Sequence, residues 1–151
     1  LREAALRGGR RALCLTGPGG IGKTALAREF LAQEAARFPG GAVFVDCSAE
    51  RDAARLPFRI GAALGLRETT AEPEAMSRLL AARIGQAPTL LVLDNLEQLP
   101  EAGPRLAPLL GSCRALVLVA TSRKPSGLPG EFALALGPLD CPPARDGEGG
   151  G

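Results

Sequence analysis

The chain has 151 residues, a net charge of +2 and 46% hydrophobic residues, ordinary values for one soluble globular domain. Aromatic residues make up only 3%, so the core must be built from Leu, Val, Ile and Ala, and base stacking on aromatic platforms is disfavoured. The small, scattered charge argues against direct nucleic-acid binding by this domain, and no apolar run approaches the roughly 20 residues of a membrane span.

Apolar runs alternate with helical patterns along the chain. The expected strands, in chain order, are residues 12–16, 42–46, 89–94, 115–120 and 132–136. The expected helices are residues 23–37, 53–64 with an interruption at Pro57, 74–84 and 105–110. The strands are continuously apolar, as strands of a parallel sheet buried on both faces are, so the alternation predicts an α/β fold. Residues 140–151 lack periodicity and are expected to form a linker or tail after a domain of residues 1–139.

The cysteines and the basic N-terminal segment carry weaker signals. No two of the four cysteines form a C-x-x-C pair and the chain has no His, so a zinc site is disfavoured. Cys14 lies in an apolar run and is expected to be a core residue, with reduced thiols in a cytoplasmic protein. The cluster of Arg7, Arg10 and Arg11 could touch phosphates, but a solvated segment is favoured. The chain begins with Leu1 and ends in a Gly-rich tail, so we expect it to be a piece of a longer protein.

The turn after the first strand matches the complete phosphate-binding pattern G-x-x-x-x-G-K-[ST]. Its residues are Gly17, Pro18, Gly19, Gly20, Ile21, Gly22, Lys23 and Thr24, with Ala25 beside them in the first helical turn. Glycines let the backbone curl so that successive N–H groups point at phosphate oxygens, and the helix N-terminus adds partial positive charge. Lys23 is expected to reach the β- and γ-phosphates, and the Thr24 hydroxyl to bind Mg²⁺. The sequence therefore predicts a site for ATP or ADP with Mg²⁺.

A second motif is the buried run of residues 90–94 (LLVLD), which ends in a carboxylate and fits the Walker B pattern. Asp94 is expected to orient Mg²⁺ directly or through a water, the alternative being a helix N-cap. Many hydrolysing P-loop ATPases place a carboxylate at the next position, where this chain has Asn95, a poor base. Glu97 could reach the site from the next turn or remain a solvated loop residue. Arg123, after the fourth strand in Thr121-Ser122-Arg123, could contact a γ-phosphate or lie in an exposed loop.

Taken together, these segments resemble the nucleotide-binding domain of the signal-transduction ATPases with numerous domains, the NB-ARC-like (STAND) class. The phrases that carry the resemblance are LTGPGGIGKTALA, FVDCSAE, LLVLDNLEQL, VLVATSRKPSGLPGE and LGPL. They span about residues 13–139 and are most similar to bacterial regulator ATPases fused to LuxR-type or other winged-helix transcription factors.

The resemblance implies a P-loop NTPase three-layer sandwich with a mostly parallel five-stranded sheet of order 5-1-4-3-2. It further implies that Thr121-Ser122-Arg123 is sensor 1, and that the domain switches between a closed ADP state and an open ATP state, often as an oligomer. Two expected departures limit the analogy: we expect this sequence to lack the helical and winged-helix modules that normally follow after about Leu139, and to lack or shorten the Gly-Arg-Glu-like phrase that normally leads into Leu1. Adenine recognition is therefore expected to be incomplete.

The function expected from these observations is an ATP/ADP-binding switch of a multidomain signalling or transcription regulator, with slow Mg²⁺-dependent ATP hydrolysis. Lys23, Asp94, Arg123 and Glu97 are the candidate catalytic residues, and Thr24 and Asp94 the candidate metal ligands. Expected partners are C-terminal helical and winged-helix modules and an ATP-dependent homo-oligomer. One alternative is a small-molecule P-loop kinase, although no compact Arg-rich lid is visible. Another is a non-hydrolysing nucleotide-binding scaffold, which Asn95 leaves open, and a DNA-remodelling motor is disfavoured by the low charge.

Overall fold

The computed structural model describes residues 9–19 and 22–137. Within the phosphate-binding motif, Gly20 and Ile21 lie outside the described residues. Arg7, Cys141 and the predicted tail of residues 140–151 also lie outside them, so the structure does not test those predictions.

The centre of the fold is a five-stranded, all-parallel sheet with the strand order β2-β3-β4-β1-β5. The strands are β1 (Ala12–Thr16), β2 (Gly41–Asp46), β3 (Thr89–Asp94), β4 (Leu116–Ser122) and β5 (Phe132–Ala135). Read from β5, this is the 5-1-4-3-2 order that the sequence resemblance implied. Every residue of β1 and β3 is buried, which explains why their sequences lack a polar face. The predicted α/β fold is confirmed.

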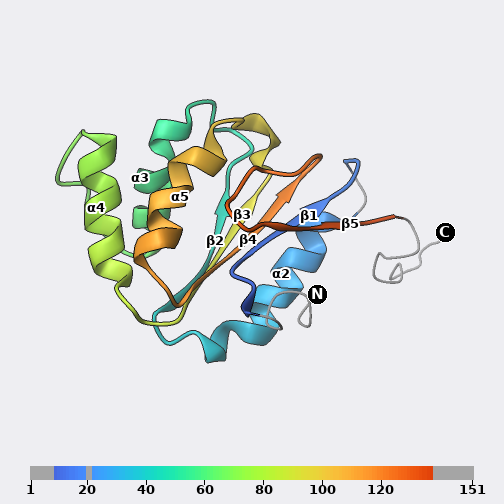
Figure 1. Cartoon of the computed structure of the whole chain (residues 1–151), viewed down its shortest axis with the longest axis horizontal. Coiled ribbons are helices and arrows are strands. Elements are labelled where there is room, and N and C mark those ends of the chain that lie inside the picture. Colours follow the sequence, from blue (N-terminus) through green and yellow to red (C-terminus); the bar gives the residue numbers. More distant parts are fainter. Residues whose placement is uncertain (1–8, 20–21, 138–151) are drawn as a thin grey trace.

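Helices cover both faces of the sheet and make the molecule three-layered (Figure 1). The helix α2 (Lys23–Glu34), continued by the 3-10 turn η2 (Ala35–Arg37), packs on one face around Phe30, Leu13 and Val92. On the other face lie α3 (Leu56–Ala63), α4 (Pro73–Ile84) and α5 (Ala102–Ser112), whose apolar side chains form the larger core. Two further 3-10 turns are η3 (Ala53–Arg55) and η4 (Leu96–Gln98).

Several predicted boundaries differ from the structure by one residue, and three elements differ by more. Pro57 does not interrupt a helix of residues 53–64, because it lies in the first turn of α3, where a missing N–H costs nothing. The helix expected at residues 105–110 is longer, since packing of its leucines outweighs the low helix propensity of the Gly and Pro in its first turn. Strand β4 continues to Ser122, so Thr121 is a strand residue and only Arg123 follows the strand.

The described cysteines are core residues, as expected for Cys14. Cys14, Cys47 and Cys113 are free and fully buried. Burial raises the pKa of Cys14 to about 11 and that of Cys47 to about 12, so both thiols stay protonated at neutral pH. No helix within the described residues is both long enough and apolar enough to cross a membrane.

Two of the N-terminal arginines have structural contacts that the expectation of a solvated segment missed. The guanidinium of Arg10 lies over the Phe132 ring, 4.1 Å from its centroid. Arg11 donates from Nη1 to the Cys113 carbonyl at 2.8 Å and from Nη2 to the Leu110 carbonyl at 2.9 Å. Carbonyls at the end of a helix lack intrahelical partners, so Arg11 caps the C-terminus of α5 and ties it to the start of β1.

We expect Arg11→Ala to lower the free energy of unfolding by about 1–3 kcal/mol, because hydrogen bonds from a charged donor to carbonyls at the end of α5 are lost. Urea unfolding measures the change. Arg10→Ala is the matched control, since it removes the same charge but only one stacking contact, worth about 0.5–1 kcal/mol. Equal losses in the two variants would contradict the capping role.

Candidate functional site

A cavity of about 410 Å³ opens where the carboxyl ends of β3 and β4 meet the N-terminus of α2. Parallel α/β sheets place ligands at this edge. The residues that line the cavity come from the three motifs singled out in the sequence and are Gly19, Gly22, Lys23, Thr24, Asn95, Glu97 and Arg123. The fold therefore brings together residues that are far apart in the sequence.

The phosphate-binding loop joins β1 to α2 in the strand–loop–helix arrangement that its motif requires. Gly22 is the N-cap of α2 and has a left-handed backbone with φ of 95°. Few residues other than glycine adopt this conformation. The N-cap has no side chain to bond the free N–H groups of the first turn, so those donors and the positive end of the helix dipole remain available to an anion.

The Lys23 side chain is held inside the loop that carries it. It is buried, with 7% exposure, and its Nζ donates to the Gly17 carbonyl at 2.7 Å and to the Pro18 carbonyl at 2.9 Å. Because Lys23 lines the cavity, its ammonium group presents a positive charge there. The geometry suits contact with phosphate oxygens, which accept strong charge-assisted hydrogen bonds.

Asp94 is the centre of a polar network at the end of β3. The carboxylate is 3% exposed and accepts the Thr24 hydroxyl, 3.0 Å from each of its oxygens. The buried Thr121 hydroxyl donates to Asp94 Oδ1 and accepts the Asn95 N–H at 2.9 Å. These contacts fix the orientation of the carboxylate toward Thr24. A helix N-cap role for Asp94 is not what the structure shows, because Asn95 occupies the cap position of η4.

The donor set at Thr24 and Asp94 fits a magnesium ion. Mg²⁺ prefers oxygen ligands and is usually held by one or two protein oxygens together with phosphates and waters. A hydroxyl and a carboxylate in contact supply such oxygens, beside the loop expected to hold the phosphates. A further carboxylate lies nearby, since Glu97 lines the cavity and its Oε1 is buried with no hydrogen-bond partner among the described residues. A buried carboxylate oxygen without a partner is uncommon and is suited to bind a water.

Arg123 reaches across the cavity to the phosphate-binding loop. Its side chain is exposed, and its Nη2 lies 3.0 Å from the point where a Cβ on Gly19 would stand. A side chain at position 19 would therefore push the guanidinium away. Arg123 is thus an exposed loop residue whose guanidinium lies beside the phosphate-binding loop.

Not every predicted residue lines the cavity. Ala25 is exposed on the first turn of α2, and Pro18 contributes its carbonyl to Lys23 rather than a cavity wall. Thr121 was predicted as part of the Thr121-Ser122-Arg123 segment after the fourth strand and not as a partner of Asp94, because that contact depends on the pairing of β4 beside β3. Asp46 was missed entirely, although it ends β2 and is the register partner of Asp94.

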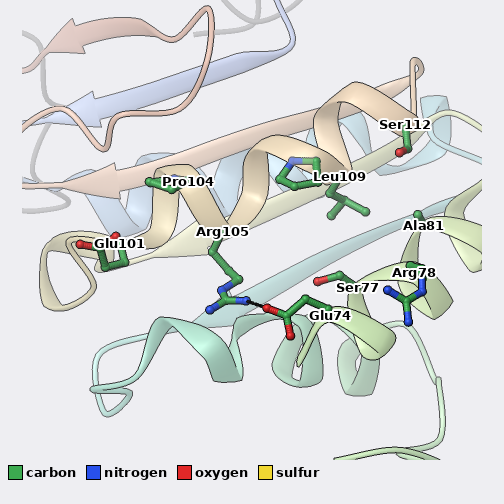
Figure 2. Close-up of a pocket in the computed structure, with 10 residues that line it drawn as sticks. Glu74, Ser77, Arg78, Ala81, Glu101, Pro104, Arg105, Leu109 and Ser112 are labelled. Carbon is green, nitrogen blue, oxygen red and sulfur yellow. Dashed lines mark hydrogen bonds and ion pairs between the residues drawn. The ribbon is translucent and has the colours of Figure 1, made fainter. Parts of the chain in front are cut away.

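A second cavity, of about 490 Å³, lies between α4 and α5 in the outer helical layer and not at the ends of the strands. Arg105 of α5 reaches toward Glu74 of α4 across it, and their side chains pair at 3.3 Å (Figure 2). Its lining includes no glycine-rich loop and no residue of the sheet. The chemistry predicted from the motifs therefore belongs to the cavity beside Lys23.

Comparison with known proteins agrees with this geometry. Residues 6–128 match the family described as AAA domain. A candidate HTH-type transcriptional regulator of Mycobacterium bovis is 36% identical over 129 residues, which are 85% of this chain and 14% of that protein. An uncharacterised Mycobacterium tuberculosis protein is 35% identical over 133 residues, 86% of this chain and 33% of that protein. The chain thus spans a third or less of the length of these relatives.

Solved structures show the same fold at low sequence identity. Drosophila ORC bound to DNA superimposes with a TM-score of 0.61 at 19% identity, over 89% of this chain and 40% of that chain. Cdc6p from Pyrobaculum aerophilum gives a TM-score of 0.56 at 18% identity, over 82% of this chain and 36% of that chain. The family match covers most of the chain, and described residues of the sequence motifs line one cavity. The chain therefore belongs to the AAA domain family and is a P-loop ATPase domain.

Proposed function

We propose that this domain is the ATP/ADP-binding switch of a multidomain signalling or transcription regulator of the NB-ARC-like (STAND) type, with slow Mg²⁺-dependent ATP hydrolysis. The observation that supports it most is the convergence of Lys23, Thr24 and Arg123 on one cavity, with Asp94 hydrogen-bonded to Thr24. Each group matches a different part of a magnesium nucleotide: Lys23 the β- and γ-phosphates, Thr24 and Asp94 the metal ion, and Arg123 the γ-phosphate.

In this proposal the loop from Gly17 to Thr24 holds the phosphates through backbone N–H groups, and Lys23 contacts the β- and γ-phosphates. Thr24 and Asp94 hold Mg²⁺, which when bound neutralises charge on the terminal phosphate oxygens. Thr121 fixes Asp94 by hydrogen bonding and thereby keeps the ligand oxygens in place. Gly20 and Ile21 are included in the phosphate-binding loop because of the sequence motif alone.

Arg123 is the proposed reporter of the γ-phosphate. A switch can shift between two states only by the difference in affinity that its ligands have for them. Arg123 follows β4, which lies between β1 and β3, so its side chain enters the cavity from between the phosphate loop and Asp94. A cation placed there distinguishes ATP from ADP because only ATP carries the γ-phosphate.

The rest of the regulator is proposed to supply the output. The mycobacterial relatives are much longer than this chain, and one is named as a candidate HTH-type transcriptional regulator. DNA binding in the parent protein would then belong to a separate module, in accord with the net charge of only +2 here. From the family resemblance we propose two kinds of partner: helical and winged-helix modules that follow the domain, and further copies of the protein in an ATP-dependent homo-oligomer. We also propose that the protein is cytoplasmic.

Turnover by this chain is expected to fall well below the typical enzyme median of about 10 s⁻¹, because Asn95 cannot act as a base. Glu97 is the proposed substitute, since its unpartnered Oε1 can hold a water beside the cavity. Phosphate release at saturating Mg·ATP measures the rate. Glu97→Gln should lower it a further 100-fold or so, with ATP affinity unchanged.

Glu101→Gln is the matched control, because Glu101 lies at the α4–α5 cavity and should leave the rate as it is. A rate near the median in the unchanged chain would contradict the switch proposal. No release at all would favour the non-hydrolysing scaffold, and phosphate transfer to a small-molecule acceptor would favour the kinase.

A further inference from the structure

A carboxylate closes the loop that carries Arg123. The Arg123 loop, residues 123–131, joins the end of β4 to the start of β5. At its last residue, Glu131 Oε1 accepts the Leu128 N–H at 3.2 Å, and Oε2 accepts the Ser126 N–H at 3.1 Å. The Ser126 hydroxyl also donates to Oε1. Hydrogen bonds to a carboxylate are about twice as strong as those between neutral groups, so one side chain holds the second half of the loop in place.

The closed part of the Arg123 loop is also packed tightly against α5. Leu128 is buried in the core that α5 helps to form. Gly103 lies in the first turn of α5, and a Cβ at this position would stand 2.5 Å from the Gly127 carbonyl oxygen and 2.9 Å from that of Ser126. Both distances are shorter than a carbon atom can approach a backbone oxygen. A side chain at position 103 would therefore displace either the loop or the helix.

The place of Arg123 depends on these contacts because its own side chain is exposed. Its backbone lies between two fixed points. On one side is Ser122, the buried last residue of β4, whose Oγ accepts the Lys124 N–H at 3.4 Å. On the other side is Ser126, which Glu131 holds through its N–H and its hydroxyl. A side chain at the cavity keeps a defined geometry only when the residues around it fix its backbone, so the closed loop determines where the guanidinium lies.

We infer that Glu131 is a positioning residue for Arg123: its carboxylate closes the Arg123 loop against α5 and thereby holds the guanidinium at the cavity beside Gly19. The closure belongs to the folded chain itself. Its consequence for nucleotide selectivity rests on the proposed function, so the two parts are tested by separate measurements.

The closure is tested by amide hydrogen exchange without nucleotide. Glu131→Ala removes both acceptor oxygens, and the N–H groups of Ser126 and Leu128 should then exchange about tenfold faster or more. Glu131→Gln keeps one acceptor oxygen and should have a smaller effect. The control is Glu72→Ala, because Glu72 is exposed and its side chain does not cap α4, so exchange in the Arg123 loop should not change. Unchanged exchange in Glu131→Ala would overturn the inference.

The positioning role is tested by titrating ADP and a non-hydrolysable ATP analogue. Glu131→Ala should weaken the ATP analogue about 5- to 10-fold and ADP less than about twofold, and Glu131→Gln should restore part of the loss. Gly103→Ala should act in the same direction, because it displaces the loop without changing the carboxylate. A loss of general stability would weaken both ligands alike, and that result would overturn the positioning role.

A double-mutant cycle with Arg123→Ala shows whether Glu131 acts through the guanidinium. In the Arg123→Ala background, Glu131→Ala should cause no further weakening of the ATP analogue. The same loss in both backgrounds would overturn the inference. If Arg123→Ala alone weakened neither ligand, the proposed function would be contradicted instead, and hydrogen exchange would still decide whether Glu131 closes the loop.

Discussion

Lys23→Ala should weaken binding of both ATP and ADP by about 100-fold or more. Lys23 is the one charged side chain that the phosphate-binding loop itself places, and it is buried beneath the loop with its ammonium group on two loop carbonyls. A hydrogen bond to a charged group contributes about 1.5–3 kcal/mol, so contact with two phosphates accounts for about 3 kcal/mol or more, and each 1.4 kcal/mol is tenfold in affinity. Both nucleotides lose binding because both carry a β-phosphate.

Calorimetric titration of each nucleotide measures this loss, and circular dichroism with thermal unfolding shows that the fold persists. Lys124→Ala is the matched control, since Lys124 is an exposed lysine that does not line the cavity. It should bind both nucleotides as the unchanged chain does. Unchanged affinity in Lys23→Ala would mean that the loop does not hold the phosphates.

Arg123→Ala should weaken ATP binding about 10- to 100-fold and leave ADP binding almost unchanged. The guanidinium lies against Gly19 at the edge of the cavity and has no hydrogen-bond or ion-pair partner in the part of the chain that the structure describes. It is therefore available for a charge-assisted bond to a phosphate, worth about 1.5–3 kcal/mol. ADP lacks the γ-phosphate and should lose little.

The measurement is a paired titration of ADP and a non-hydrolysable ATP analogue on the unchanged chain and the variant. Arg114→Ala controls for the loss of a positive charge, because Arg114 is exposed and precedes β4, at the opposite end of the strand from Arg123. Equal weakening of both ligands would make Arg123 a general phosphate contact, and no weakening would remove it from the site. Either result would exclude its role as the reporter of the γ-phosphate.

Much of the fold could be predicted because its signals are local. The strand at residues 12–16 and the strand at residues 89–94 were predicted with the bounds that the structure has, since an apolar run between turn residues marks a buried strand without reference to the rest of the chain. The strand order came from the family resemblance, because no local pattern specifies which strands are neighbours. The phosphate-binding loop could likewise be predicted from the sequence, because its motif consists of consecutive residues.

The remaining features depend on contacts between distant residues. The Thr121 hydroxyl donates a hydrogen bond to Asp94 only because β4 pairs beside β3, and the residues around position 121 do not predict that contact. Asn95 could be recognised as a poor base, but its left-handed backbone goes with a hydrogen bond from its N–H to Thr121 of the neighbouring strand β4, which the local sequence does not reveal. Arg11 was misinterpreted for the same reason, since its partners lie about 100 positions away at the end of α5.

The most direct test of the account is a crystal structure of this chain with Mg²⁺ and a non-hydrolysable ATP analogue. We expect the β- and γ-phosphates on the loop from Gly17 to Thr24, with Lys23 Nζ within hydrogen-bond distance of both. The magnesium ion should lie about 2.1 Å from Thr24 Oγ1, with Asp94 as a ligand directly or through one water. Nucleotide bound elsewhere, or phosphates on this loop with no metal at Thr24 and Asp94, would contradict the account.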